Sequence, residues 1–153
     1  LVLSTLHTND APSAITRLTE MEIEPFLVGS ALDSVVAQRL ARRLCDRCKQ
    51  PYTPVATDIA ALGFWIDPDQ PVPVLHQPAG CQVCSNTGYR GRIAIHEVMS
   101  VSEEIERLAV RRASSAEIRK IAMAEGMLTL RQDGWSKAQM GLTSIDEILR
   151  VVA

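Results

Sequence analysis

The four cysteines of this chain stand in two closely spaced pairs, and these pairs constrain its fold more than any other feature. Cys45 and Cys48 form the first C-x-x-C pair, and Cys81 and Cys84 form the second. Two such knuckles supply the four thiolates of a tetrahedral Zn²⁺ site, with Zn–S distances of about 2.3 Å. A metal held by four protein ligands has no open position for a substrate. We therefore predict that these cysteines bind a structural Zn²⁺ that takes no part in catalysis.

Disulfides and free or redox-active thiols are the alternative uses of these cysteines. A disulfide framework requires an oxidising compartment and is typical of chains too small to build a core. This chain has 153 residues, of which 46% are hydrophobic, so it can bury a core without cross-links. Basic residues crowd the first pair, where they would offset the charge of a zinc tetrathiolate or equally solvate the end of a helix. They are Arg42, Arg43, Arg47 and Lys49.

Charge and hydropathy narrow the classes of partner. The formal net charge of −2 gives no general electrostatic reason to expect nucleic acid. No apolar run approaches the roughly 20 residues that span a bilayer, so we expect a soluble chain. The sequence begins directly on the apolar run Leu1-Val2-Leu3, and we expect it to be a piece of a longer protein.

Hydrophobic periodicity predicts an α/β framework at the start of the chain. We expect a short buried strand at residues 1–4, then a polar turn and a helix that Asn9 or Asp10 caps. A second helix is predicted from Pro25 to about Leu44, because apolar residues recur at every fourth position along one stripe. The stripe comprises Val28, Leu32, Val36, Leu40 and Leu44.

The central segment is rich in proline, and the end of the chain is helical. Six of the eight prolines lie between Pro51 and Pro78, which predicts irregular backbone with one turn of helix near residues 58–62. The pattern of residues 93–99 predicts a strand that leads back to the α/β framework. Capping boxes at Ser114 and Ser144 favour helices, which we expect near 102–112, 115–125, 128–140 and 144–152.

The polar turn at residues 4–10 is placed like an active-site element. It follows a predicted strand and precedes a predicted helix, where open α/β sheets bind ligands and backbone N–H groups favour phosphate. His7 can donate a hydrogen bond to a phosphate oxygen, and Thr5 or Thr8 can add a hydroxyl. A capped turn with a surface histidine is the alternative. The sequence has no G-x-x-x-x-G-K-[ST] loop and no predicted strand that ends in an acidic pair, so we expect this chain to be inactive alone.

Five groups of residues carry a resemblance that covers nearly the whole chain. They are Leu3–Ala11, Ala14–Leu18, Gln38–Leu40 with Arg43–Cys45, Cys81–Cys84 with Gly88–Arg92, and Gly126–Met127 with Gly141–Thr143. The first group resembles the histidine box of the secretion ATPase superfamily. The others, in the same order, resemble the branch that powers type II secretion and type IV pilus assembly. Within that branch the chain is most similar to the E proteins of the general secretory pathway.

The resemblance implies an α/β fold. The chain would be the carboxy-terminal portion of a RecA-like P-loop ATPase domain. Residues 1–44 would complete the ATPase core, residues 45–92 would form the inserted tetracysteine zinc module, and residues 93–153 would form a mainly helical subdomain. The implied function of the full-length protein is ATP hydrolysis that powers type II protein secretion through pseudopilus assembly. Upstream sequence would supply the Walker A and Walker B elements that bind ATP and Mg²⁺. His7 and Thr5 would lie near the nucleotide phosphates, with His7 in a phosphate-sensing, catalytic role.

The resemblance also implies partners and a location. Members of the family form ring-shaped homo-hexamers in the cytoplasm and bind the cytoplasmic domain of an inner-membrane secretion-platform protein. We expect the full-length protein to associate peripherally with the inner membrane in this way, without a nucleic-acid partner, and the choice between secretion and pilus systems stays open. Phe64 and Trp65 in the proline-rich segment are candidates for contact with the partner, and burial beneath the loop is the alternative.

A stand-alone zinc-ribbon module that binds protein or nucleic acid is the alternative function. Such a module requires basic and aromatic residues on its zinc knuckles. Aromatic residues make up only 4% of this chain. The charge of a zinc tetrathiolate would account for the basic residues near Cys45, so the composition favours the ATPase fragment.

Overall fold

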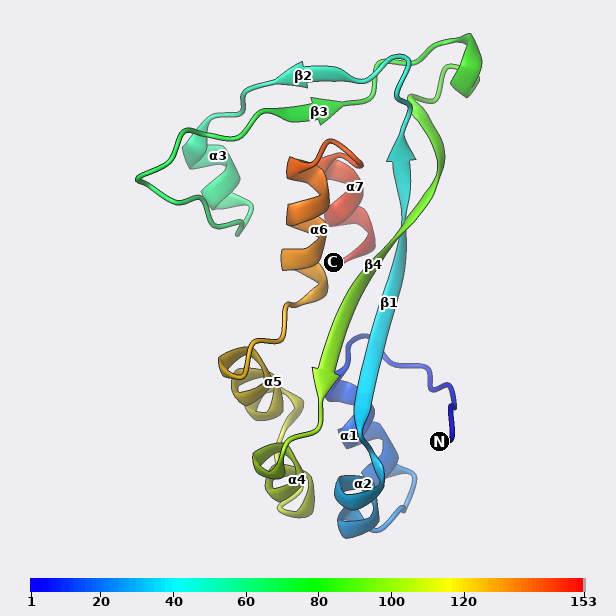
Figure 1. Ribbon diagram of the computed structural model, residues 1–153, viewed down its shortest axis with the longest axis vertical. Helices are drawn as coiled ribbons and strands as arrows, with labels where there is room; N and C mark the ends of the chain where they lie inside the picture. The colour runs from blue at the N-terminus through cyan, green and yellow to red at the C-terminus, as the bar shows by residue number, and fades with distance from the viewer. Residues whose placement is uncertain (153) are drawn as a thin grey trace. The chain divides into compact units, whose positions relative to one another are not determined.

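The computed structural model describes residues 1–152 and contains both helices and strands (Figure 1). The strands are β1 (Ser34–Leu44), β2 (Gln50–Tyr52), β3 (Leu75–Gln77) and β4 (Tyr89–Ser100). The helices are α1 (Pro12–Glu20), α2 (Pro25–Ala31), α3 (Ala56–Ala61), α4 (Glu103–Val110), α5 (Ser115–Ala124), α6 (Leu130–Gln139) and α7 (Ile145–Val151), with a 3₁₀ turn at Gln82–Cys84. A helix needs about 20 apolar residues to span a bilayer, and none of those formed by residues 1–152 has that length and hydropathy.

The chain divides into two compact units. Unit 1 comprises Leu1–Gln38 with His96–Leu130, and unit 2 comprises Arg39–Ile95 with Arg131–Ala153. The long strands β1 and β4 pair in a two-stranded sheet, and each strand belongs partly to one unit and partly to the other. They run in opposite directions (Figure 1).

Unit 1 is mainly helical. Within it, α2 packs against α4 and α1 packs against α5, while α4 and α5 also contact each other. Gly29 brings the α2 backbone close to α4, because a Cβ at this position would lie 3.4 Å from backbone and side-chain atoms of Glu106. The core consists of buried apolar side chains, which include Ile15, Val28, Met99, Ile105 and Ile118.

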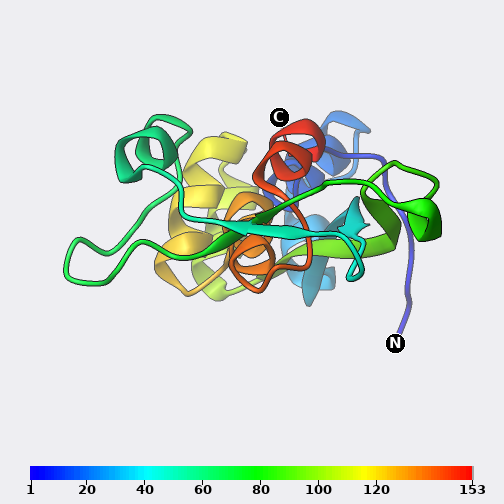
Figure 2. The same cartoon turned by 90° about the horizontal axis from the view of Figure 1, so that it is seen from above.

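Unit 2 holds the proline-rich segment and all four cysteines. The short strands β2 and β3 pair in antiparallel fashion, with Pro51 opposite His76, and Figures 1 and 2 both show them side by side. The segment that joins them carries α3, whose Ile59 is buried. The helical turn in this segment agrees with the prediction, whereas the two strands were not predicted, because proline removes a backbone donor and lowers the expectation of pairing.

Two close contacts contribute to the core of unit 2. The ring of Phe64 stacks on that of Trp135 in α6, with 5.0 Å between centroids. Gly134 lies against Ile148 of α7, and a Cβ at residue 134 would come within 2.9 Å of the Ile148 Cγ2. The missing side chain at Gly134 therefore allows α6 and α7 to approach each other closely. Phe64 is buried, whereas the neighbouring Trp65 is 74% exposed, so of the two aromatic candidates only Phe64 is covered by the protein.

The predicted helix from Pro25 to about Leu44 is wrong beyond residue 31. Helix α2 ends at Ala31, and residues 34–44 form β1. Val36 and Leu40, which were expected on the apolar stripe, are exposed, whereas Ala37 and Ala41 on the other face are buried. A repeat of four residues fits one face of a helix and also one face of a strand, so periodicity alone chose the wrong element.

The expected strand at residues 1–4 does not form, because among the described residues no other segment pairs with it, and Leu1, Val2 and Leu3 are exposed. The strand near 93–99 and the four carboxy-terminal helices are confirmed to within a few residues. Helix α1 starts beside Asp10, whose Oδ1 accepts a hydrogen bond from the Ser13 N–H at 2.9 Å. The mixture of helix and sheet agrees with the predicted α/β class, and the division into core, zinc insertion and helical subdomain stays a prediction.

Candidate metal centre

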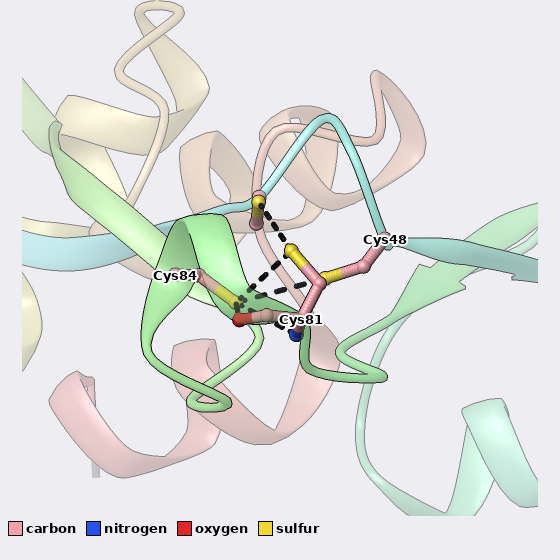
Figure 3. A group of neighbouring side chains, drawn as sticks. Cys48, Cys81 and Cys84 are labelled. Atoms are coloured by element: carbon pink, nitrogen blue, oxygen red, sulfur yellow. Dashed lines mark hydrogen bonds between the residues drawn. The ribbon is translucent and has the colours of Figure 1, made fainter.

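The four cysteine sulfurs gather at one point in unit 2. All four Sγ atoms lie within 4.8 Å of one another. The Sγ of Cys45 lies 3.9 Å from that of Cys81, and the Sγ of Cys84 lies 3.8 Å from that of Cys48 and 3.7 Å from that of Cys81. Figure 3 shows Cys48, Cys81 and Cys84 pointing toward one another. Sulfurs at the corners of a tetrahedron around Zn²⁺, with Zn–S of about 2.3 Å, are about 3.8 Å apart. The cluster therefore has the dimensions of a zinc tetrathiolate site.

Local backbone geometry builds each knuckle. Cys45 follows the last residue of β1, and its carbonyl oxygen accepts hydrogen bonds from the N–H groups of Cys48 at 3.2 Å and Lys49 at 3.0 Å. In the second knuckle, the 3₁₀ turn places Cys81 and Cys84 on one side. The Cys45 N–H donates to the Gly88 carbonyl oxygen at 2.9 Å, which joins the two knuckles through their backbones.

Gly88 is required by both conformation and space. Its φ is +76°, in the left-handed region that favours glycine. A Cβ at this position would lie 2.3 Å from the Pro78 Cβ, so any side chain would collide with the proline. The Gly88 N–H donates to the Cys84 Sγ at 3.3 Å, and the Cys81 N–H donates to the same sulfur at 3.2 Å. Backbone N–H groups directed at a sulfur favour its thiolate form.

Cys48 and Cys84, one thiol from each knuckle, differ from each other in pKa. Burial raises the pKa of the Cys84 thiol, but hydrogen bonds from the backbone N–H groups of Cys81 and Gly88 outweigh that effect and lower the pKa to about 6. Burial raises the pKa of the Cys48 thiol to about 11, and its hydrogen bonds with the other cysteines act in the same direction. Cys84 is therefore the more readily ionised of these two metal-ligand candidates.

The basic residues near the first knuckle pair with carboxylates. Arg43 and Lys49 flank Asp46, at 3.0 Å and 3.1 Å respectively. These pairs are exposed at Asp46, so each contributes little to stability. Because residues 34–44 form a strand, the alternative that these charges solvate the end of a helix is wrong.

Glu147 at the start of α7 braces the end of β1, and sequence analysis missed it. Its side chain is fully buried, and it accepts hydrogen bonds from the Arg42 backbone N–H at 2.8 Å and from the Arg42 Nη2 at 2.7 Å. Arg150 donates to the same carboxylate through its Nε at 2.9 Å. The Arg42 guanidinium also lies over the Tyr89 ring, 4.2 Å from its centroid. Because Arg42 stands three residues before Cys45, these contacts fix the strand that leads into the first knuckle.

The residues just before α7 extend this support. The Thr143 Oγ1 donates to the Arg42 carbonyl oxygen at 2.9 Å, and the Leu44 N–H donates to the Leu142 carbonyl oxygen at 2.9 Å. The Lys49 Nζ donates to the Gly141 carbonyl oxygen, also at 2.9 Å. We call residues 141–147 the bracing segment. Its only sequence signal was the pattern Ser144-x-x-Glu147, of which one half is observed: the Ser144 Oγ accepts from the Glu147 N–H, while the Glu147 carboxylate binds the arginines.

The two residues predicted to lie near phosphates belong to unit 1. Thr5 and His7 are exposed on backbone without regular secondary structure. Immediately after them, the Thr8 Oγ1 donates a hydrogen bond to the Asp10 carbonyl oxygen at 3.1 Å. Their roles toward a nucleotide stay predictions.

Comparison with known proteins gives consistent similarities along the whole chain. The family described as "Type II/IV secretion system protein" matches residues 1–150. The "Type IV pilus assembly ATPase PilB" of Thermus thermophilus is 46% identical over 149 residues, which cover 97% of this chain and 17% of that protein. The "Type II secretion system protein E" of Pseudomonas aeruginosa is 45% identical over 151 residues, which cover 99% of this chain and 29% of that protein. The "Type II secretion system ATPase E" of Vibrio cholerae is 42% identical, with the same coverage of 99% and 29%. The chain thus spans less than a third of the length of each of these relatives.

Proposed function

This chain belongs to the type II/IV secretion system protein family, and we propose that it is the carboxy-terminal part of an ATPase that powers type II secretion or type IV pilus assembly. The observation that carries the proposal is the identity of 42–46% over nearly all of the chain to relatives, two of which are named ATPases. The names divide between secretion and pilus systems, so the system served stays open.

ATP hydrolysis would require residues that this chain does not contain. The sequence has no G-x-x-x-x-G-K-[ST] loop, the usual cradle for nucleotide phosphates. Because the chain spans less than a third of its relatives, we propose that the rest of the protein supplies this loop and the carboxylate that binds Mg²⁺. RecA-like folding of the ATPase core is part of the same proposal.

The turn that contains Thr5 and His7 would contribute to the nucleotide site. Both side chains are exposed just before the first helix, so neither needs to leave a core to reach a ligand. An imidazole N–H can donate a hydrogen bond to a phosphate oxygen, and the Thr5 hydroxyl can add a second donor. We assign His7 the role of sensing the phosphates.

The four cysteines fit Zn²⁺ in a structural role. The dimensions of the cluster match a tetrahedral thiolate site, and the two N–H donors to the Cys84 Sγ suit a thiolate ligand. All four positions around the metal would be filled by protein, so the metal would cross-link the knuckles and would take no part in ATP hydrolysis. The bracing segment supports the first knuckle from outside the cysteine cluster.

The oligomer and partners belong to the proposal as well. We propose that the full-length protein forms a homo-hexamer in the cytoplasm and binds the cytoplasmic domain of an inner-membrane secretion-platform protein, without nucleic acid. Trp65, at 74% exposure on the proline-rich segment, is our candidate for contact with a partner. Aromatic side chains contribute strongly to binding when a partner buries them.

Two experiments test the proposal. The gene sequence upstream of the Leu1 codon should encode a Walker A loop, and an intact reading frame that starts near Leu1 would favour the stand-alone zinc-ribbon module instead. In the full-length protein, His7→Ala should lower ATP turnover about 100-fold to 1,000-fold, the range for loss of one positioned donor. The exposed His96 in β4 gives the matched control, because His96→Ala should leave turnover near that of the unmodified protein. Unchanged turnover in His7→Ala would support the alternative, in which His7 is a surface residue of a capped turn and does not act on the nucleotide.

A further inference from the structure

Glu97 is a buried carboxylate in unit 1 that the metal centre does not use. It lies on the inward face of β4, two residues from Ile95 and two from Met99, and it is only 3% exposed. Removing a carboxylate from water is costly unless donors replace the lost hydration. We therefore expect buried Glu97 to accept hydrogen bonds from protein donors.

Those donors are backbone N–H groups at the starts of two helices. One Glu97 oxygen, Oε1, accepts from the Ala11 N–H at 2.8 Å, directly before α1. The other, Oε2, accepts from the N–H of Leu130, the first residue of α6, at 3.2 Å. The first N–H groups of a helix have no partner within the helix, and the helix dipole there favours negative charge. A single side chain thus satisfies a donor at each of two helix starts that lie more than 100 residues apart in the sequence.

A second contact holds the same turn. The Asp10 Oδ2 forms an ion pair with the Arg119 guanidinium of α5, while its Oδ1 accepts from the Ser13 N–H. Asp10 and Ala11 are thereby attached to β4 and α5 through Glu97 and Arg119. His7 stands three residues before Asp10, and the backbone spans at most about 3.6 Å per residue. The position of this anchor therefore limits where the His7 imidazole can reach.

We propose that Glu97 is a positioning residue for the turn that carries His7, and that Arg119 supports it through Asp10. The proposal rests on the proposed function in assigning His7 a role in ATP hydrolysis. Its structural half, the control of the turn at residues 8–11 by Glu97, stands without that role. Glu97 does not touch the nucleotide in this proposal. It acts by fixing the backbone from which His7 extends.

Glutamine is the informative substitution at this position, because it keeps the shape of the side chain and removes one acceptor. An amide NH₂ cannot accept from a backbone N–H, so either Ala11 or Leu130 loses its partner. Hydrogen exchange followed by NMR measures this directly in the protein without nucleotide. In Glu97→Gln, we expect the protection of the Ala11 or Leu130 amide to fall about tenfold or more, with faster exchange across residues 8–11. Glu103→Gln is the matched control in the same unit, because its side chain is 88% exposed.

Turnover by the full-length protein measures the consequence for His7. We expect Glu97→Gln to lower kcat about 10-fold to 100-fold, as a displacement of about 1 Å in a catalytic group can do, with a much smaller change in KM for ATP. If Glu97 acts through the turn, then Glu97→Gln should cause little further loss in a protein that already carries His7→Ala. If Glu97 were purely structural, the fold-losses of kcat in the two single variants would multiply in the double variant.

The outcomes separate the two proposals. Unchanged exchange at residues 8–11, or a loss of kcat that multiplies with that of His7→Ala, overturns the role of Glu97. A full-length protein without ATP turnover overturns the proposed function, and the exchange measurement then still decides whether Glu97 holds the turn. If Glu97→Gln does not fold, Arg119→Gln gives the second test, because the Arg119 side chain is 42% exposed and its loss leaves the core intact. Arg119→Gln should speed exchange at the same turn, and unchanged exchange there would contradict the proposal.

Discussion

Replacing Glu147 by glutamine removes a buried negative charge from the bracing segment without changing the shape of the side chain. In the native protein the two Glu147 oxygens bind Arg42 and Arg150, and the side chain is fully buried. Burial raises the pKa of the carboxyl, but hydrogen bonds from Arg150 and Arg42 outweigh it and lower the pKa from 4.5 to about 2. Ionised Glu147 therefore stabilises the folded state at neutral pH.

The size of this contribution follows from the pKa difference. At about 1.36 kcal/mol per pH unit, a pKa that falls from 4.5 to about 2 corresponds to about 3 kcal/mol. The Arg42 and Arg150 side chains are 48% and 57% exposed, so solvent screens part of their attraction. We expect Glu147→Gln to cost about 2 kcal/mol at pH 7. The pKa of the Glu147 carboxyl is lower in the folded protein than in the unfolded protein. Its contribution to stability is therefore present above pH 4.5 and is lost as the pH falls towards about 2.

Urea unfolding followed by tryptophan fluorescence measures this cost, because Trp135 is nearly buried in the same unit. The difference in unfolding free energy between the native protein and Glu147→Gln should be about 2 kcal/mol at pH 7 and should shrink steadily below pH 4.5. Asp146→Asn is the matched control, because Asp146 is the exposed neighbour in the same helical turn and should matter by less than about 1 kcal/mol. A difference of the same size at pH 3 and pH 7, or none at pH 7, would refute the role of this charge.

Further predictions concern the metal, the aromatic pair and the helix contact in unit 2. Cys45→Ser should reduce bound zinc from one per chain towards zero and speed amide exchange at Gly88; zinc retained at full stoichiometry would argue against a four-thiolate site. Phe64→Ala should cost about 3–4 kcal/mol in urea unfolding, because the ring is buried, whereas the exposed Trp65→Ala should cost less than about 1 kcal/mol. If the two substitutions cost the same unfolding free energy, the difference in burial between Phe64 and Trp65 would be contradicted. Gly134→Ala should raise the unfolding free energy by up to about 1 kcal/mol through helix propensity, but lower it by about 1–3 kcal/mol because the new methyl group crowds Ile148. A net increase in stability would contradict the close contact between the two helices.

Each half of the cysteine cluster could be predicted from the sequence because the C-x-x-C spacing is local. The meeting of the two halves joins residues 36 positions apart and depends on the fold. A C-x-x-C pair brings two sulfurs to one side of a single turn, whatever the rest of the chain does. Likewise, the capping box at Ser114 is confirmed in full, since the Glu117 carboxylate accepts from the Ser114 N–H at 2.9 Å and the Ser114 Oγ accepts from the Glu117 N–H at 3.3 Å. Such contacts join residues three positions apart and need no knowledge of the fold.

Strand β1 could not be predicted in this way because its structure depends on a distant partner. It pairs with β4, which follows the whole proline-rich segment in the sequence. In the strand, Ala37 and Ala41 are buried and the larger Val36 and Leu40 are exposed, so hydrophobicity indicated the wrong face. Tertiary contacts of this kind decide whether an ambiguous segment becomes helix or strand.

The buried carboxylates were missed for a related reason. Glu97 and Glu147 are acidic residues among apolar ones, and composition alone places them at the surface. The alternation in β4 offered a usable signal, because Glu97 shares the inward face with Ile95 and Met99. No such signal pointed to the partner of Glu147, since Arg42 lies 105 residues away in sequence.

The cluster of four cysteines is the central feature of this protein, and X-ray absorption at the zinc edge tests most directly the proposal that it forms a closed tetrathiolate site. A purified sample should contain one zinc per chain, with four sulfur neighbours at about 2.3 Å and no nitrogen or oxygen ligand. That result would match the Sγ cluster, in which all four atoms lie within 4.8 Å of one another. Protein prepared under reducing conditions that contains no zinc, or whose zinc has a water or nitrogen ligand, would contradict the assignment of these cysteines.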